Sequence, residues 1–119
     1  MISKIDWATV PLEQVNPSMR RRLVTGERIT VAQIWFKDGF LVPQHSHHQE
    51  QVTQVVSGRM RFWIEADRHE VVEVGPGEVV VIPPNVPHEA LCIGDVHEID
   101  IWSPRRDDWL NGTDAYLRG

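Results

Sequence analysis

The chain has 119 residues, a length typical of one domain built around one hydrophobic core. Its formal net charge of -5 and the lack of a basic stripe argue against nucleic acid or an anionic membrane surface as a partner. Cys92 is the only cysteine, no apolar run approaches the roughly 20 residues of a membrane span, and the N-terminus has no long apolar signal core. We therefore expect residues 1–119 to form one cytoplasmic domain.

Along the chain, short stretches of alternating apolar and polar residues are interrupted by Gly, Pro and Asn, which is typical of β-structure. The expected strands are residues 28–37, 52–56, 60–65, 71–74, 78–82, 89–93 and 96–102. The Ser57-Gly58 pair predicts a hairpin between the second and third of these strands. Residues 12–22 and 107–117 are compatible with a helical turn. The regular strand spacing predicts an all-β sandwich or barrel.

Three histidines at two separated places form a candidate metal site. His45 and His47 belong to one run, and His88 follows a proline-rich turn later in the chain. A His-x-His pair on a strand points both rings to one face, and neutral imidazole is a common ligand of the later first-row metals. The sequence therefore predicts one divalent transition metal, and imidazole ligands alone do not distinguish Zn, Ni, Mn, Fe and Cu.

The spacing around these histidines resembles the two motifs of the cupin superfamily. The first reads Gly39-x5-His45-x-His47-x3-Gln51-x6-Gly58, and the second reads Gly77-x5-Pro83-x-Asn85-x2-His88. Gln51 stands where a Glu is usual, Asn85 replaces the second Gly, and Cys92 replaces the closing Asn. The resemblance implies an antiparallel jelly-roll β-barrel over about residues 28–104, with extensions at both ends. It also implies a homodimer.

Carried over position by position, the resemblance implies His45, His47, Gln51 and His88 as the metal ligands. Glu50, next to Gln51, is the alternative fourth ligand. We expect His48 at the rim of the site, because strand alternation after His47 points it away.

The residues outside the motifs have simpler predicted roles. His69 and His97 are expected at the surface, and the arginine triplet 20–22 is expected on a solvated face. Trp35 and Trp63 lie within expected strands, so we predict them in the core.

The last expected strand carries a second constellation. Glu98, Asp100 and Trp102 share one face, and Ile99 and Ile101 share the other. One interpretation places the isoleucines in the core and the carboxylates in water. The alternative is that the acidic face lines a site.

Residues 100–110 and 19–27 are similar to KdgF-like cupins, which convert unsaturated uronates into linear keto forms. This resemblance implies that the metal holds a small acidic metabolite and that Asp100 moves a proton. It implies further that Arg106 pairs with the substrate carboxylate and that Trp102 forms an apolar wall. Arg105 could replace Arg106, because both offer a planar donor fork.

The neutral Gln51 leaves the charge of a divalent cation uncompensated, so the metal would attract anions and act as a Lewis acid. This favours isomerase, lyase or hydrolytic chemistry over redox chemistry. Two other hypotheses stay open at this point: a dioxygenase with iron or copper, and a non-catalytic module that binds a metal and a small acid.

Overall fold

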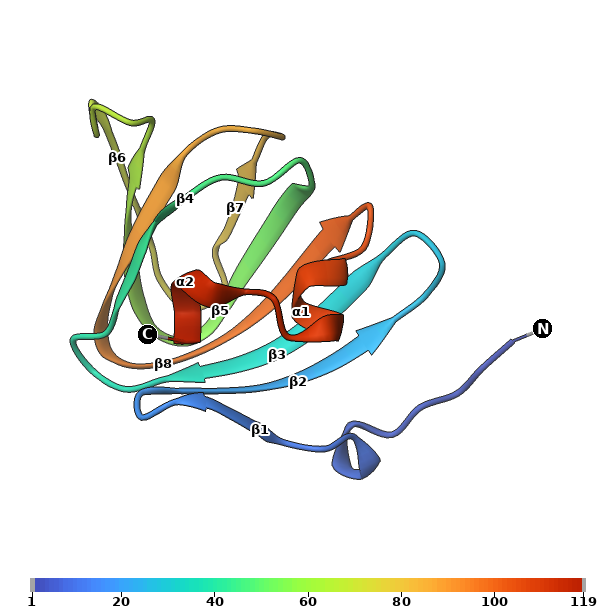
Figure 1. The fold of residues 1–119 in the computed structure, drawn as a ribbon. Helices are drawn as coiled ribbons and strands as arrows, with labels where there is room; N and C mark the ends of the chain where they lie inside the picture. Colours follow the sequence, from blue (N-terminus) through green and yellow to red (C-terminus); the bar gives the residue numbers. More distant parts are fainter. Residues whose placement is uncertain (1, 119) are drawn as a thin grey trace.

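The computed structural model describes residues 2–118 and consists mainly of antiparallel strands (Figure 1). The elements are η1 (Trp7–Thr9), β1 (Glu13–Asn16), β2 (Met19–Thr25), β3 (Thr30–Phe36), β4 (Leu41–His45), β5 (Glu50–Ile64), β6 (Glu70–Val74), β7 (Val79–Ile82), β8 (His88–Ser103), α1 (Asp107–Asn111) and α2 (Ala115–Arg118). No helix among residues 2–118 is long and apolar enough to cross a bilayer.

Strands β5 and β8 run through both layers of the fold. In one layer the order is β1-β2-β3-β8-β5-β7, where the later half of β8 pairs with the earlier half of β5. In the other layer the order is β4-β8-β5-β6, formed by the opposite halves. The inner faces of the two layers enclose the apolar core. The antiparallel jelly roll predicted from the sequence is confirmed.

The predicted hairpin at Ser57-Gly58 is wrong, because residues 50–64 form the single strand β5. Gly58 bends this strand instead of reversing it: its φ is +80°, and an added Cβ would lie 2.3 Å from the Asp95 carbonyl oxygen. Only glycine fits such a close backbone approach. Gly94, also at positive φ, lies within the continuous strand β8, so two predicted strands merge there too.

The predicted helical turn in residues 12–22 is wrong, because this segment forms β1 and the start of β2. The buried positions of β2 begin with Met19 and Arg21, two residues apart, as strand geometry requires. Because one of the inward-facing residues is an arginine, the alternation of apolar and polar residues that indicates a strand is not visible in this segment. Arg21 is completely buried, so the prediction of a solvated arginine triplet is also wrong at this position.

The C-terminal segment contains the predicted helical turn as two short helices separated by Gly112, which has a positive φ. Asp114 anchors this segment against β2, because its buried carboxylate accepts from Arg21 Nη1 at 2.6 Å and from Arg118 Nε at 2.7 Å. Figure 1 shows α1 and α2 lying across one end of the two layers. The C-terminal segment therefore contributes side chains to the interior of the jelly roll.

The tryptophan prediction is wrong for Trp35 and Trp63, which are half-buried. Trp35 stacks on His97 at 4.5 Å between ring centroids, and Arg68 covers Trp63. The deeply buried tryptophans are Trp102 and Trp109. They pack edge to face with a centroid separation of 4.6 Å, at the side of the core that meets the candidate site.

Candidate functional site

The three predicted histidine ligands come together at one end of the jelly roll. His45 ends β4 and is the cross-strand partner of His88, which begins β8. His47 follows in the loop before β5. One ring nitrogen from each histidine lies within 4.8 Å of the other two, a separation that allows one cation to bind all three.

The ring orientation of each histidine is fixed by its own backbone neighbourhood. The Nδ1 atoms of His45, His47 and His88 lie 2.8, 3.0 and 2.9 Å from carbonyl oxygens of residues 43, 49 and 86. A carbonyl oxygen only accepts, so each Nδ1 carries the hydrogen and donates it. The lone pair of each neutral ring is therefore on Nε2, which is the atom free to bind a metal.

All three rings are held in the neutral form that metal binding requires. Burial lowers the pKa of His45 to about 3, with a further contribution from His88. Burial and the nearby Arg106 guanidinium lower the pKa of His47 to about 4. The pKa of His88 is also lowered, mainly by burial. At neutral pH the site therefore presents three unprotonated imidazoles.

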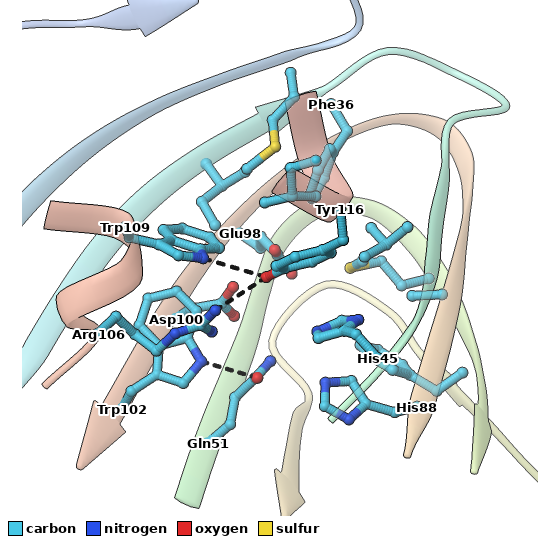
Figure 2. Close-up of a pocket in the computed structure, with 17 residues that line it drawn as sticks. Phe36, His45, Gln51, His88, Glu98, Asp100, Trp102, Arg106, Trp109 and Tyr116 are labelled. Atoms are coloured by element: carbon cyan, nitrogen blue, oxygen red, sulfur yellow. Dashed lines mark hydrogen bonds between the residues drawn. The ribbon is translucent and has the colours of Figure 1, made fainter. Parts of the chain in front are cut away.

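The Gln51 amide is held with its oxygen toward the histidines. Trp102 Nε1, which can only donate, lies 2.9 Å from Gln51 Oε1, and Gln51 Nε2 donates to Thr53 Oγ1 at 2.8 Å. The same amide oxygen lies 3.0 Å from His47 Nε2. Figure 2 shows the Trp102 bond and the amide oriented toward His45 and His88.

This orientation brings two lone pairs together. Neutral His47 carries its hydrogen on Nδ1, so Nε2 and Gln51 Oε1 are both acceptors, 3.0 Å apart. Two facing acceptors repel unless a cation lies between or beside them. In addition, His88 Nε2 is buried and has no hydrogen-bond partner within residues 2–118. A divalent metal bound by the three Nε2 atoms and the Gln51 oxygen would satisfy every one of these groups.

Glu50, the alternative fourth ligand, lies on the other face of β5 from Gln51. Its side chain is exposed, whereas Gln51 is buried, as alternation along a strand requires. His48 is exposed, as expected for a rim residue. His69 is exposed as predicted, and His97 is half-buried, with its Nδ1 atom 3.0 Å from the Ile34 carbonyl oxygen.

The acidic face of β8 points inward. Glu98 and Asp100 are each 3% exposed and line the pocket that His45 and His88 also line, whereas Ile101 is 37% exposed. The interpretation that places the isoleucines in the core and the carboxylates in water is therefore wrong. The reason is that the interior of the jelly roll is polar at this pocket, which His45, Gln51, His88 and Arg106 also line.

Glu98 and Asp100 behave as a pair that shares a proton. Burial raises the pKa of Asp100 to about 6, while hydrogen bonds from Glu98 and Thr53 act in the opposite direction. The pKa of Glu98 is raised by burial and by the neighbouring Asp100 charge. Of the two carboxyl groups, Glu98 therefore retains its proton more readily. Glu98 Oε2 and Asp100 Oδ1 have no hydrogen-bond partner within the described chain.

Thr53 lies between the carboxyl pair and the candidate metal ligands. It is the cross-strand neighbour of Asp100 and accepts a hydrogen bond from Gln51 Nε2. A hydrogen bond from Thr53 also lowers the pKa of Asp100. The same side chain therefore contacts both parts of the pocket.

Arg106 lines the pocket, but its donor fork is already engaged. Its Nε and Nη2 atoms donate to the two Asp108 oxygens at 2.9 and 2.8 Å, and Nη2 also donates to the Tyr116 hydroxyl at 3.0 Å. Nη1 makes no hydrogen bond within residues 2–118, which leaves one nitrogen for a ligand. Arg105 is exposed, pairs with Asp107 and does not line this pocket.

Two aromatic residues of the pocket were not predicted from the sequence. Trp109 from α1 and Tyr116 from α2 both line it, and the Tyr116 ring stacks on His45 at 4.3 Å between centroids. Tyr116 accepts from Trp109 Nε1 at 3.2 Å (Figure 2). Trp109 lies in the stretch 100–110 that is similar to KdgF-like cupins, which could have marked it, whereas Tyr116 belongs to no motif and is brought to the site only by the fold of the C-terminal segment.

The comparisons with known proteins agree with this geometry. The model of the cupin domain matches residues 36–102, more than half of the chain. The chain therefore belongs to the cupin family. A search among curated proteins found no match.

Among solved structures, the chain is similar to KdgF from Halomonas sp., with 27% identity, a TM-score of 0.82, and coverage of 92% of this chain and 99% of that one. It is also similar to an RmlC-like cupin from Shewanella frigidimarina, with 25% identity, a TM-score of 0.78, and coverage of 86% and 90%. Oxalate decarboxylase from Bacillus subtilis, at 16% identity, a TM-score of 0.76, and coverage of 87% and 30%, shares the fold.

Proposed function

We propose that this cupin is a metal-dependent isomerase that opens an unsaturated or keto sugar acid. The observation that carries the proposal is that one pocket combines a neutral set of metal donors with a buried carboxyl pair. A cation there attracts an acidic ligand, and a carboxylate with a pKa of about 6 is suited to accept a proton near neutral pH. The similarity to KdgF supports this choice among cupin activities.

His45, His47, His88 and Gln51 would hold the metal. When bound, the metal supplies positive charge that attracts and orients the oxygen atoms of an acidic ligand. All four donors are neutral, so none of that charge is cancelled by the ligands. Imidazole suits several first-row metals, so the donor set is compatible with Zn, Ni, Mn, Fe or Cu.

The reaction needs one proton acceptor and one proton donor. In an unsaturated uronate the ring oxygen bonds to the anomeric carbon and to one carbon of the C=C bond. Removing the anomeric hydroxyl proton forms an aldehyde and breaks the bond between the anomeric carbon and the ring oxygen, whose electron pair becomes an enolate. Protonation of the far alkene carbon gives the ketone. One proton leaves and one arrives, so the product is an isomer of the substrate.

Asp100 would accept the first proton, since its pKa of about 6 suits a base near neutral pH and Glu98 retains its own proton more readily. Arg106 would meet the substrate carboxylate through Nη1, because Asp108 holds the other edge of the guanidinium. Trp102 would form the apolar wall and hold the Gln51 oxygen toward the metal.

The test is turnover by metal-loaded protein. We expect loss of the enone absorbance of an unsaturated uronate and a linear keto product by NMR, without oxygen consumption. Chelated protein should be inactive and should recover when a divalent metal is restored. Oxygen consumption with an iron- or copper-loaded sample would instead indicate a dioxygenase, and saturable uronate binding without product would indicate a binding module.

We also propose that the protein is a cytoplasmic homodimer. The outer face of the larger layer carries an apolar row across five strands, in which each residue is the cross-strand neighbour of the next. The row consists of Val24, Val31, Ile101, Val52 and Val81. A second copy of the chain would cover it, and a solution mass of 13.7 kDa, that of one chain, by light scattering would contradict the dimer.

A further inference from the structure

Tyr116 lies between the histidine cluster and the side of the pocket that holds Arg106 and the carboxyl pair. Its ring stacks on His45 with an interplanar angle of 23°, and its hydroxyl reaches Arg106, on the side of the carboxyl pair (Figure 2). It comes from α2, which the buried pair between Asp114 and Arg21 holds against the body of the fold. The hydroxyl is therefore placed by the fold and does not hang freely at the surface.

The hydrogen bonds of this hydroxyl determine the direction of its own proton. Arg106 Nη2 lies 3.0 Å and Trp109 Nε1 lies 3.2 Å from the Tyr116 oxygen. Guanidinium and indole nitrogens donate and cannot accept, so both interactions use lone pairs of the oxygen. A hydroxyl group has two such lone pairs and one hydrogen. The hydrogen must therefore go to a third partner.

No residue between 2 and 118 accepts that hydrogen. The hydroxyl makes only the two bonds from Arg106 and Trp109. The buried oxygens Glu98 Oε2 and Asp100 Oδ1 stay without a partner, so they do not receive it. A phenol remains protonated at neutral pH because its ordinary pKa is about 10. Tyr116 thus presents a donor that the described part of the chain does not use, in a pocket for which the proposed function implies an anionic ligand.

We propose that Tyr116 is a catalytic residue that donates a hydrogen bond to the anionic oxygen of the bound ligand. In the isomerisation, on which this assignment rests, that oxygen is the ring oxygen as it becomes an enolate. The donors Arg106 and Trp109 polarise the hydroxyl, because bonds accepted by its oxygen strengthen the bond that it donates. Asp100 and Tyr116 then divide the work: one accepts the proton of the anomeric hydroxyl, and the other stabilises the negative charge that results.

The test compares wild type with Tyr116→Phe and with 3-fluorotyrosine at position 116. Phenylalanine keeps the ring on His45 and removes only the hydroxyl. Fluorine makes the hydroxyl a stronger donor and a weaker acceptor, so the two possible roles of the group change in opposite directions. All three proteins are loaded with the same metal, and metal content and melting temperature are measured to confirm equal folding.

For Tyr116→Phe we expect kcat for the unsaturated uronate to fall on the order of 100-fold. The affinity for galacturonate, measured by calorimetry, should fall roughly 5-fold, as for one lost hydrogen bond. The fluorinated protein should keep or exceed the wild-type kcat. A fluorinated protein that is slowed together with Tyr116→Phe would overturn the proposal, since it would show that Tyr116 acts only as an acceptor that positions Arg106.

The outcome separates this inference from the proposed function. Wild-type turnover that is unchanged in Tyr116→Phe would reject the donor role and leave the isomerase in place. No turnover by wild type, together with weaker galacturonate binding by Tyr116→Phe, would reject the isomerase and keep the donor role. Equal affinity of both proteins for galacturonate, or no binding to either, in the absence of turnover would reject both.

Discussion

The two halves of the pocket are built by different means. On the metal half, each histidine is oriented by a carbonyl group two residues away in the chain. On the carboxyl half, Asp100 depends on Glu98 and on Thr53 of another strand, while Arg106 depends on Asp108 and Tyr116 from the C-terminal helices. Local anchoring makes the metal half recognisable from a short motif. Tertiary anchoring makes the carboxyl half recognisable only from the fold.

The largest expected effect separates the two halves completely. His88→Ala removes a buried donor whose Nε2 has no other partner, so we expect the purified protein to retain no stoichiometric metal. Asp100→Asn should retain it, because Asp100 touches the candidate ligands only through Thr53. Elemental analysis after gel filtration measures both. Metal retained by His88→Ala would mean that the histidines are structural.

Asp100→Asn should have the next largest effect, on catalysis alone. Loss of the proton acceptor is expected to lower kcat by about 1000-fold. The same change should raise the melting temperature at pH 8, because burial raises the pKa of Asp100 to about 6 and its ionised form therefore destabilises the fold. Thermal scans and uronate turnover on the same sample check the pair of effects. A lower melting temperature with normal turnover would contradict the assigned role.

Trp102→Phe tests whether a residue of the strand that carries Asp100 stabilises metal binding by the other half of the pocket. Trp102 belongs to β8, as Asp100 does, yet its indole donates to the Gln51 oxygen on the metal half. Removing that donor leaves the amide held only through its bond to Thr53, so we expect metal affinity to fall roughly 10-fold. Competition with a chelator measures the affinity. Gln51→Glu is the matched comparison, because its carboxylate oxygen should bind more tightly whether or not the indole is present.

The sequence predicted the parts of the molecule that depend on local spacing. The antiparallel jelly roll and the three-histidine cluster follow from short motifs and strand alternation, whereas the choice between Gln51 and Glu50 stayed open until the structure placed Gln51 inside and Glu50 outside. The burial of Arg21 could not be predicted because it depends on Asp114, far along the chain. The sequence does not distinguish a turn at Gly58 from a bend within a strand, because glycine adopts the positive φ that either one requires. Tyr116 has no local pattern at all.

Glu98→Leu and Glu98→Gln test whether the hydrogen bond from Glu98 controls the pKa of Asp100. The hydrogen bond from Glu98 lowers the pKa of Asp100, although burial has the larger, opposite effect. Leucine removes the bond, so the acidic limb of the pH–rate profile should move to higher pH. Glutamine can still donate, so its profile should stay closer to that of wild type. Identical profiles for both variants would show that Glu98 does not control Asp100.

The smallest expected effect concerns folding stability: acidification should change the contributions of the metal half and the carboxyl half in opposite directions. The pKa values of His45 and His47 are lowered from 6.5 to about 3 and about 4, so the unfolded chain binds more protons than the folded one as pH falls below 6.5. Their contribution to stability is therefore lost on acidification. The pKa of Asp100 is raised from 3.8 to about 6, so the folded chain binds the extra proton between these values and acidification stabilises it.

In metal-free protein the histidines should dominate, and the melting temperature should fall between pH 6.5 and pH 4. His45→Gln should make that fall shallower, because it removes one group that must stay neutral to remain folded. Asp100→Asn should make it steeper, because it removes the opposing contribution. Calorimetric melting at several pH values measures the three slopes. A shallower slope for Asp100→Asn would mean that this carboxyl group is already ionised at pH 4, and it would then be too weak a base for the proton transfer assigned to it.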